Sequence, residues 1–244
     1  MNESIRDQYT CMDQKNCAII YFTRSSLSES RKKKWFNSYE KNLRFARTLI
    51  SKTRQNLLDT GIDVLEIDES LQVGNTFGNR IANAFDFGFG RGYDSLILVG
   101  NDAVGLLPSH LIEAKNALEN TSKVFGANSH GGAYLIGFQK QEFYVSQTAF
   151  VQLPWQTNEL WEAIDSNFGT SGNAFLEILP DLNSKMDIIY LLGDVKQAPK
   201  LNELLASVVA DENKPLVQIV SNRDSIAFHQ LKPLRGPPVR FAFC

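Results

Sequence analysis

A carboxylate follows one of the most apolar segments of the chain. Residues 95–99 read Ser-Leu-Ile-Leu-Val, and Gly100, Asn101 and Asp102 come directly after them. A carboxylate beside a buried strand is unfavourable unless it meets a cation, a metal ion or water. Asp102 is therefore open to three interpretations: a cap for the next segment, an exposed acid, or a ligand for a divalent ion that bridges nucleotide phosphates, since such ions prefer oxygen ligands.

A serine-rich, basic segment is the second candidate for chemistry. Residues 24–34 read Arg-Ser-Ser-Leu-Ser-Glu-Ser-Arg-Lys-Lys-Lys. Backbone N–H groups, hydroxyls and ammonium groups together suit phosphate, which makes Thr23, Arg24, Lys32 and Lys34 candidate phosphate contacts. The GxxxxGK[ST] pattern of a P-loop is missing, and a solvated basic surface is the alternative.

The third candidate is the segment over residues 72–80, Gln-Val-Gly-Asn-Thr-Phe-Gly-Asn-Arg. Gln72 can pair with a base edge through its donor and acceptor. Gly78 permits close approach of the backbone, and Arg80 offers a planar fork to phosphate. The alternative is a helix entry with ordinary surface polar residues.

Composition limits the classes of function. The formal net charge of −2 argues against a nucleic-acid binder, yet residues 24–54 hold ten Lys and Arg against two Glu. Such asymmetry indicates an anionic ligand near this region, or a protein partner that docks on the basic face of residues 31–54. The three cysteines form no CxxC or zinc-type spacing, so neither a disulfide framework nor a structural metal is indicated.

The apolar pattern alternates between short strands and amphipathic helices, which predicts an α/β fold with a parallel sheet. Strands are expected at residues 17–23, 62–67, 95–99, 123–125, 133–138 and 175–179. Helices are expected at residues 36–57 with Gly61 as the cap, 77–89, 109–118 with Ser109 as the cap, 159–168, 186–192 and 201–209, and residues 24–34 are expected to form a loop.

A single domain is expected over residues 17–210. The polar lead over residues 1–16 is expected to be disordered, and residues 211–244 to form an extension that packs on the domain or is partly exposed. Within that extension, residues 235–240 contain two prolines and cannot form a helix interior. No apolar run approaches the ~20 residues that span a bilayer, so we expect a cytoplasmic protein without a transmembrane segment.

Five stretches, taken in order, resemble a bacterial family of nucleotide-sugar-transferase-like proteins, the domain of unknown function 2064. The resemblance covers about residues 17–190. The stretches are Ile-Ile-Tyr-Phe-Thr-Arg at residues 19–24, the helix entry with Gln72, Gly78 and Arg80, Val-Gly-Asn-Asp at residues 99–102, Gly-Gly-Ala-Tyr-Leu-Ile-Gly at residues 131–137, and Trp-Gln-Thr at residues 155–157.

The resemblance implies a three-layer α/β/α fold with a mostly parallel sheet, the glycosyltransferase-A-like fold of nucleotide-diphospho-sugar transferases. It also implies a nucleotide-sugar or nucleotide ligand, with Mg²⁺ or Mn²⁺ held by Asp102. The residues that match nucleotide- or phosphate-binding positions are Thr23, Arg24, Lys32, Lys34, Gln72, Gly78, Arg80 and Asn101.

Two departures from the family pattern bear on activity. Ala103, Val104 and Gly105 follow Asp102 where the family has a second acid, and His130 stands where the family has an aspartate. His130 is a candidate catalytic residue with Asp102: it could bind metal, act as a base, or face solvent. Further along, Asp181 could supply a ligand or a base, whereas Asp187 suits the first turn of a helix.

Three functions remain open at this stage. The first is a glycosyltransferase with a nucleotide-diphospho-sugar donor and a divalent metal, and a nucleotidyltransferase is a close variant. The second is a non-catalytic nucleotide or sugar-nucleotide binder that has lost active-site acids. The third is protein interaction through the basic helix. Oligomeric state is not indicated by any pattern in the chain.

Overall fold

The computed structural model describes residues 15–169, 171–194, 196 and 198–209. The expected extension over residues 211–244, with Cys244, and most of the expected lead over residues 1–16, with Cys11, lie outside the described residues. The last two residues of that lead are described, and they belong to the first strand. This strand therefore begins two residues earlier than the sequence predicts.

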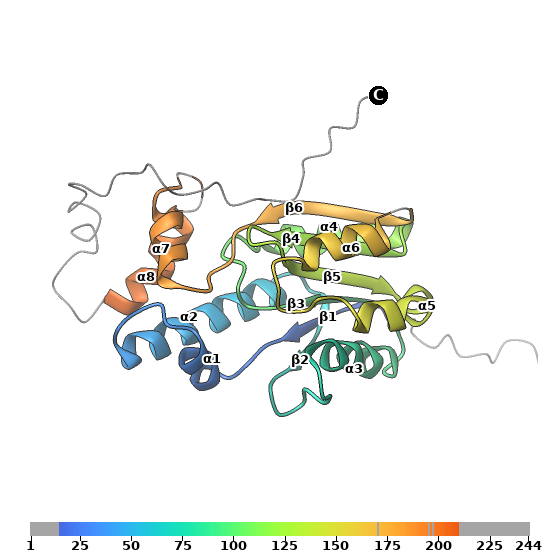
Figure 1. Cartoon of the computed structure of the whole chain (residues 1–244), viewed down its shortest axis with the longest axis horizontal. Helices are drawn as coiled ribbons and strands as arrows, with labels where there is room; N and C mark the ends of the chain where they lie inside the picture. Colours follow the sequence, from blue (N-terminus) through green and yellow to red (C-terminus); the bar gives the residue numbers. More distant parts are fainter. Residues whose placement is uncertain (1–14, 170, 195, 197, 210–244) are drawn as a thin grey trace, which may run out of the picture.

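Six strands form one sheet in the order β2-β1-β3-β5-β4-β6 (Figure 1). Strands β1, β2 and β3 pair in parallel, β5 is antiparallel to both of its neighbours, and β6 is parallel to β4. The mostly parallel sheet is confirmed. The strands are β1 (Lys15–Phe22), β2 (Asp63–Ile67), β3 (Tyr93–Val99), β4 (Lys123–Asn128), β5 (Ala133–Gln139) and β6 (Asn173–Leu179).

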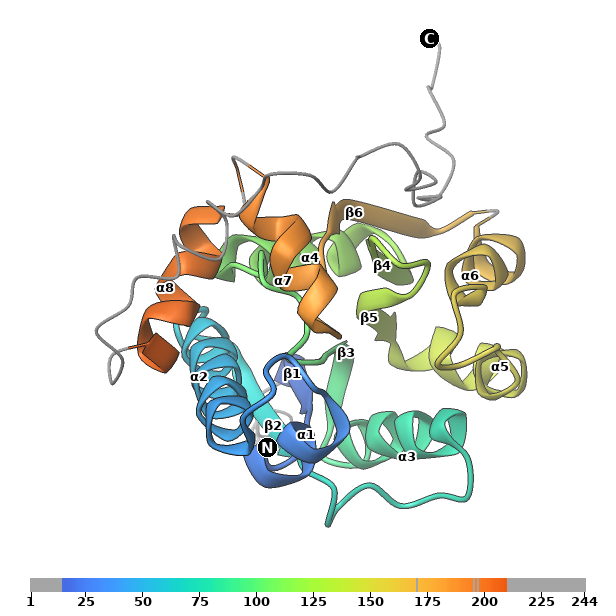
Figure 2. The same ribbon diagram turned by 60° about the vertical axis from the view of Figure 1, so that its left-hand side comes forward.

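Helices cover both faces of the sheet, which confirms the three-layer α/β/α architecture. Figure 2 shows α2 and α8 on one side of the sheet and α3, α5 and α6 on the other. The helices are α1 (Ser26–Lys32), α2 (Tyr39–Leu58), α3 (Phe77–Phe89), α4 (Pro108–Asn120), α5 (Lys140–Val151), α6 (Leu160–Phe168), α7 (Lys185–Leu192) and α8 (Ala198–Val209).

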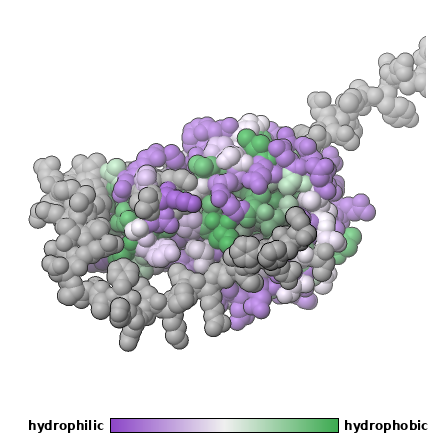
Figure 3. Space-filling model, turned by 90° about the horizontal axis from the view of Figure 1, so that it is seen from above, coloured by the Kyte–Doolittle hydropathy of each residue, from purple (hydrophilic) through white to green (hydrophobic). Residues whose placement is uncertain are grey.

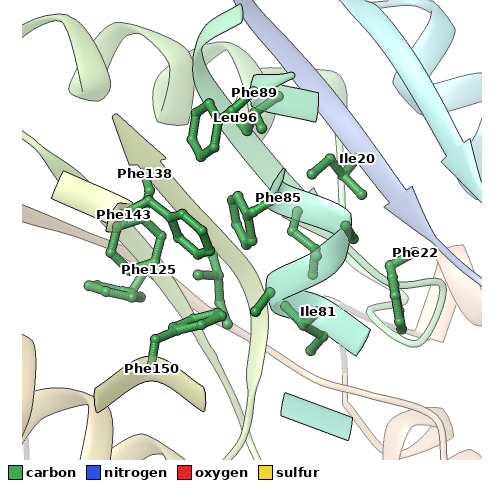
Figure 4. Packing of buried hydrophobic residues seen from close by; sticks show 14 of the residues in the cluster. Ile20, Phe22, Ile81, Phe85, Phe89, Leu96, Phe125, Phe138, Phe143 and Phe150 are labelled. Carbon is green, nitrogen blue, oxygen red and sulfur yellow. The ribbon is translucent and has the colours of Figure 1, made fainter. Parts of the chain in front are cut away.

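Side chains that alternate along the central strands contribute to two apolar cores, one on each face of the sheet. In β1, Ile20 and Phe22 face α3, whereas Ile19 and Tyr21 face α2 and α4, because successive side chains of a strand point to opposite faces. The core under α3, α5 and α6 is rich in phenylalanine (Figure 4). There Phe85 stacks on Phe143 at a centroid distance of 4.9 Å, in the offset geometry that aromatic rings prefer.

A third apolar cluster joins the segment before α2 to α7 and α8. The indole of Trp35 is fully buried in it, beside Phe45 of α2, Leu191 of α7 and Leu201 of α8. Trp35 Nε1 donates a hydrogen bond to the carbonyl oxygen of Leu182 at 3.2 Å. The cluster therefore fixes the loop between β6 and α7 against the end of α1.

Three expectations about local structure are wrong. Residues 24–34 are not all loop: they contain α1, whose N-cap Ser25 accepts a hydrogen bond from the backbone N–H of Ser28. Helix α2 ends at the cap Asp59, and Gly61 lies two residues beyond it at φ 68°. The cap of α4 is Leu107 rather than Ser109, and its backbone N–H donates to the ring of His110.

The described surface is mixed in polarity. Figure 3 shows the face that looks upward in Figure 1, where hydrophobic areas lie among hydrophilic ones. Strand β6 and helix α7 contribute exposed apolar side chains to the surface, among them Phe175, Ile178 and Met186. No helix within the described part of the chain is both long and apolar enough to cross a membrane.

Candidate functional site

A cleft of about 550 Å³ opens at the carboxyl ends of β1 and β3. Parallel strands end at the same edge of a sheet, which is where ligands bind in open α/β folds. Phe22, Leu98 and Ile136 are among the apolar residues that line it. Polar residues come from the segment after β1, from the segment after β3, from the turn between β4 and β5, and from the segment after β6.

Asn101 carries an unsatisfied polar group in this cleft. Its side chain is buried, and its Oδ1 atom accepts a hydrogen bond from the hydroxyl of Thr23 at 3.4 Å. Among the described residues, its Nδ2 is the one buried side-chain nitrogen or oxygen atom without a hydrogen-bond partner. A buried amide without a partner destabilises the protein by about 1–3 kcal/mol, so this N–H group is available to a ligand oxygen.

Asp102 is paired with a lysine. Its Oδ1 atom lies 2.5 Å from Nζ of Lys33, which also lies 3.2 Å from Oε1 of Glu29. Burial alone would lower the pKa of Lys33, but the carboxylates of Asp102 and Glu29 outweigh burial and raise it. Arg24 contacts the other carboxylate oxygen of Glu29, with its Nη1 atom 3.5 Å from Oε2. We call Arg24, Glu29, Lys32, Lys33 and Asp102 the cationic wall of the cleft.

The opposite side of the cleft carries a histidine between two acids. Nδ1 of His130 contacts Oδ1 of Asp181, and Nε2 lies 3.3 Å from Oδ1 of Asp187. Burial opposes the charge of the ring, but the two carboxylates outweigh it and raise the pKa of His130. Oδ2 of Asp181 also accepts hydrogen bonds from Asn128 and Asn183, at 3.1 and 2.5 Å. We call Asn128, His130, Asp181 and Asn183 the histidine wall.

The turn between β4 and β5 fixes His130. The Oδ1 atom of Asn128 accepts hydrogen bonds from the backbone N–H groups of His130 and Gly132, at 3.0 and 2.7 Å. Gly131 has φ 80°, and a Cβ atom there would lie 2.1 Å from the carbonyl oxygen of Asn158. A side chain at position 131 would therefore displace the turn that holds the histidine.

The backbone joins the two walls. The N–H of Leu182 donates to the carbonyl oxygen of Asp102 at 2.9 Å, and Ala103 forms an isolated antiparallel bridge with Asp181. Residues that are about eighty positions apart in sequence thus lie side by side. Asp187 lies in the first turn of α7, as expected. It forms a capping box with Ser184, the N-cap residue of this helix.

The residues of the 72–80 segment have mainly structural contacts. Gln72 lines the cleft, and its Nε2 atom donates to the carbonyl oxygens of Thr23 and Ile67 at 2.6 and 3.2 Å. Gly78 lies in α3, where a Cβ atom would come within 2.4 Å of the carbonyl oxygen of Val151. Packing of α3 against α5 therefore explains this glycine.

The serines of the basic segment bind a carboxylate of the same chain. Glu69 accepts hydrogen bonds from the backbone N–H and hydroxyl of Ser25 and from the hydroxyl of Ser28. Partial burial opposes ionisation of Glu69, but these hydrogen bonds lower its pKa to about 2. The serine groups expected to bind a phosphate are therefore occupied by Glu69. The ammonium and guanidinium groups of this segment remain as candidate phosphate contacts.

The structure brings most of the sequence-predicted residues to the cleft. Those that line it are Thr23, Arg24, Lys32, Gln72, Asn101, Asp102 and His130, whereas Lys34, Gly78 and Arg80 do not. Sequence reasoning overlooked Glu29, Asn128 and Asn183, which also line it, and it placed Lys33 in the cleft only as part of the basic run of residues 32–34. The four-residue spacing of Glu29 and Lys33 was the available signal, because residues four apart share one side of a helix.

The described residues do not assemble a ligand set for a divalent ion. They contain no group of three or more His, Cys, Asp or Glu side chains placed to hold one. The ammonium of Lys33 already occupies the Oδ1 atom of Asp102. A divalent ion at this oxygen would meet the charge of the lysine.

Residues 46–157 match the model of a family described as "Uncharacterized protein conserved in bacteria (DUF2064)". The matched stretch runs from α2 to the segment after α5 and includes Asp102 and His130. No protein of curated function matches the chain in sequence.

Solved structures identify the fold. A "putative nucleotide-diphospho-sugar transferase" from Desulfovibrio desulfuricans G20 is 19% identical, with a TM-score of 0.66 over 81% of this chain and 98% of that chain. Rv0371C of Mycobacterium tuberculosis H37Rv, solved as a complex with manganese, is 15% identical, with a TM-score of 0.41 over 74% and 100% of the two chains. The first likeness establishes the nucleotide-diphospho-sugar transferase fold for this chain.

Proposed function

We propose that the protein binds a nucleotide-diphospho-sugar in the cleft and transfers the sugar to an acceptor hydroxyl. The observation that carries the proposal is the convergence of the cationic wall with the unpartnered amide of Asn101 at the carboxyl ends of β1 and β3. The fold shared with the D. desulfuricans protein, whose name assigns it to this class of transferase, supports the same function.

The cationic wall suits the diphosphate. It holds three cations, on Arg24, Lys32 and Lys33, against the two carboxylates of Glu29 and Asp102. The excess positive charge stabilises the diphosphate in the bound donor and, more strongly, the charge that develops on it as it leaves. The N–H group of Asn101 donates a hydrogen bond to an oxygen of the bound sugar nucleotide, which gives this buried group a partner.

The histidine wall suits the acceptor. In the neutral form of His130, the Nδ1–H group donates to Asp181, and Nε2 presents a lone pair. The acceptor oxygen attacks the anomeric carbon, its proton passes to Nε2, and the bond between that carbon and the β-phosphate oxygen breaks to release the nucleoside diphosphate. No step passes through Mg²⁺ or Mn²⁺, because the ligand set that such an ion requires is incomplete at Asp102.

Binding is tested by thermal unfolding with UDP-, GDP- and CDP-sugars. We expect at least one of them to raise the midpoint of the wild-type protein, since a ligand that binds only the folded state stabilises it. Asn101→Leu keeps the branched shape and the number of non-hydrogen atoms of the side chain but removes the amide, so the shift should shrink strongly. Lys185→Met, which changes an exposed residue outside the cleft, is the matched control. Absence of any shift at millimolar nucleotide would contradict the proposal.

A non-catalytic sugar-nucleotide binder is the second candidate. It is favoured by the saturation of the acids, since Asp102 is paired with Lys33 and Asp181 with His130. Release of nucleoside diphosphate from the bound donor distinguishes the two functions. A transferase should release it faster as the pH rises through the raised pKa of His130, and His130→Gln should abolish that rise. A binder releases none at any pH.

A further inference from the structure

Lys33 brings its charge into the cleft from the end of α1. It is the C-cap residue of this helix, and its backbone N–H donates to the carbonyl oxygen of Glu29. The backbone of Lys33 is extended, at φ −104° and ψ 129°. Lys32 and Lys34 are both exposed, whereas Lys33 is buried.

Three oxygens surround the ammonium of Lys33. They belong to the carboxylates of Asp102, at 2.5 Å, and Glu29, at 3.2 Å, and to the carbonyl of Leu182, at 3.3 Å. An ammonium has three N–H donors, so each of them has an acceptor. The carbonyl of Leu182 is itself fixed by the indole of Trp35. Three separate segments of the chain therefore hold this one cation in place.

The ammonium of Lys33 disfavours a divalent ion at the same carboxylate. Mg²⁺ binds a carboxylate oxygen at about 2.0–2.1 Å and requires a nearly octahedral set of ligands. A carboxylate oxygen has two lone pairs, so an ion on the second lone pair of Oδ1 of Asp102 would lie beside the Nζ atom of Lys33, which is 2.5 Å from that oxygen. Two cations so close repel in a partly buried site. The lysine therefore competes with an ion for this carboxylate.

We propose that Lys33 is the resident cation of the cleft, in the place at Asp102 that a divalent ion would take, and that a nucleotide diphosphate binds there without Mg²⁺ or Mn²⁺. This inference rests on the proposed nucleotide-sugar function. Lys33 offsets one of the two negative charges on Asp102 and Glu29, so that Arg24, which also pairs with Glu29, and the exposed Lys32 leave a net positive charge for the phosphates. The charge is permanent near neutral pH, because the two carboxylates raise the pKa of Lys33 despite its burial.

Lys33→Met provides the test, because it should convert the cleft into a metal-dependent site. Isothermal titration calorimetry with UDP, GDP and CDP is performed in EDTA and in Mn²⁺. The wild-type affinity for the nucleotide that binds is expected to agree within about twofold in the two buffers. In Lys33→Met the affinity should fall at least about tenfold in EDTA, because two carboxylates then face the diphosphate. The affinity should recover in Mn²⁺, because those carboxylates can then bind the ion.

A second readout needs no nucleotide. Electron paramagnetic resonance of Mn²⁺ with the free protein should show no bound ion at this site in the wild type and one in Lys33→Met. Arg31→Met removes an exposed cation of α1 that does not line the cleft and should behave as the wild type in both assays. If Lys33→Met folds poorly, the wild-type affinities in EDTA and in Mn²⁺ and the wild-type resonance spectrum keep the test valid.

The outcomes separate the inference from the proposed function. Wild-type binding that requires Mn²⁺ would overturn the inference and leave the function standing. A manganese ion bound at Asp102 in the free wild-type protein would overturn it as well. A wild-type protein that binds no nucleotide in either buffer would overturn the proposed function, and the inference with it.

Discussion

The two walls of the cleft pair acids with cations in different ways. On the cationic wall, a lysine that is held by three oxygens pairs with both Glu29 and Asp102. On the histidine wall, an imidazole ring lies between Asp181 and Asp187. The pKa of Lys33 is raised from an ordinary value far above neutral pH, whereas the pKa of His130 is raised from an ordinary value of 6.5, close to neutral pH. One wall thus carries a fixed charge and the other a charge that depends on pH.

This difference suits a division of labour between the walls. Binding of a diphosphate requires a positive charge that does not vary, because the ligand is anionic at all relevant pH values. Removal of a proton from an acceptor requires a group that exists in both protonation states. The contrast is expressed in stability, in pH dependence and in nucleotide affinity, and each of these can be measured separately.

The largest expected effect is on stability at the cationic wall. Lys33→Met should lower the free energy of unfolding by about 3 kcal/mol, because removal of one partner of a buried ion pair leaves a buried charge poorly compensated. Glu29, at 2% exposure, would then keep only the longer contact with Arg24, at 3.5 Å. Urea denaturation at pH 7.5 measures the change. The double variant Glu29→Gln/Lys33→Met should recover much of the loss, and a loss below about 1 kcal/mol in the single variant would indicate an ordinary surface pair.

A smaller effect that depends on pH is expected at the histidine wall. His130→Gln should lower the free energy of unfolding by about 1.5–3 kcal/mol in acid, the range for hydrogen bonds to charged groups. Because the pKa of His130 is raised in the folded state, the contribution of the imidazolium is complete below its ordinary pKa of 6.5 and is lost as the pH rises through the raised value.

Urea denaturation between pH 5.5 and 9 measures that loss. The difference between the wild type and His130→Gln should shrink toward high pH, whereas the difference for Lys33→Met should stay constant up to pH 9. A His130 difference that grows with pH, or a Lys33 difference that follows the same curve, would remove the contrast between the walls.

The smallest effect concerns single phosphate contacts. Arg24→Met should weaken nucleotide binding about tenfold, which corresponds to 1.4 kcal/mol, because it removes a cation that lines the cleft. Lys34→Met should change the affinity less than about twofold, since this side chain is exposed and does not line the cleft. Calorimetric titration of both variants shows which cations belong to the cationic wall. Equal losses of affinity in the two variants would contradict the wall as defined.

The sequence predicts the elements whose signal is local. Strands β1 and β3 are apolar runs, and α3 has a strong helical period, so its bounds are as expected. Helix α1 is only seven residues long and rich in serine, which resembles a loop until Ser25 is recognised as a cap. Helix α5 was not predicted, because among its residues only Phe143 and Phe150 are buried, too few for a clear period.

The site depends on contacts that no local pattern contains. Lys32, Lys33 and Lys34 are equivalent in sequence. The end of α1 buries the middle one of the three and leaves the other two exposed. The hydrogen bond between Leu182 and Asp102 joins segments about eighty residues apart. The strand-end position of Asp102 indicated a cation nearby, but whether that cation is a metal ion or a lysine is decided by this packing.

A crystal structure of the protein soaked with a nucleotide-diphospho-sugar and Mn²⁺ tests the central claim most directly. The account expects the diphosphate beside Arg24, Lys32 and the amide of Asn101, with Lys33 still on Asp102 and no anomalous manganese signal at that carboxylate. A cleft that stays empty at saturating donor would contradict the proposed function, and a manganese ion on Asp102 with Lys33 displaced would contradict the resident cation.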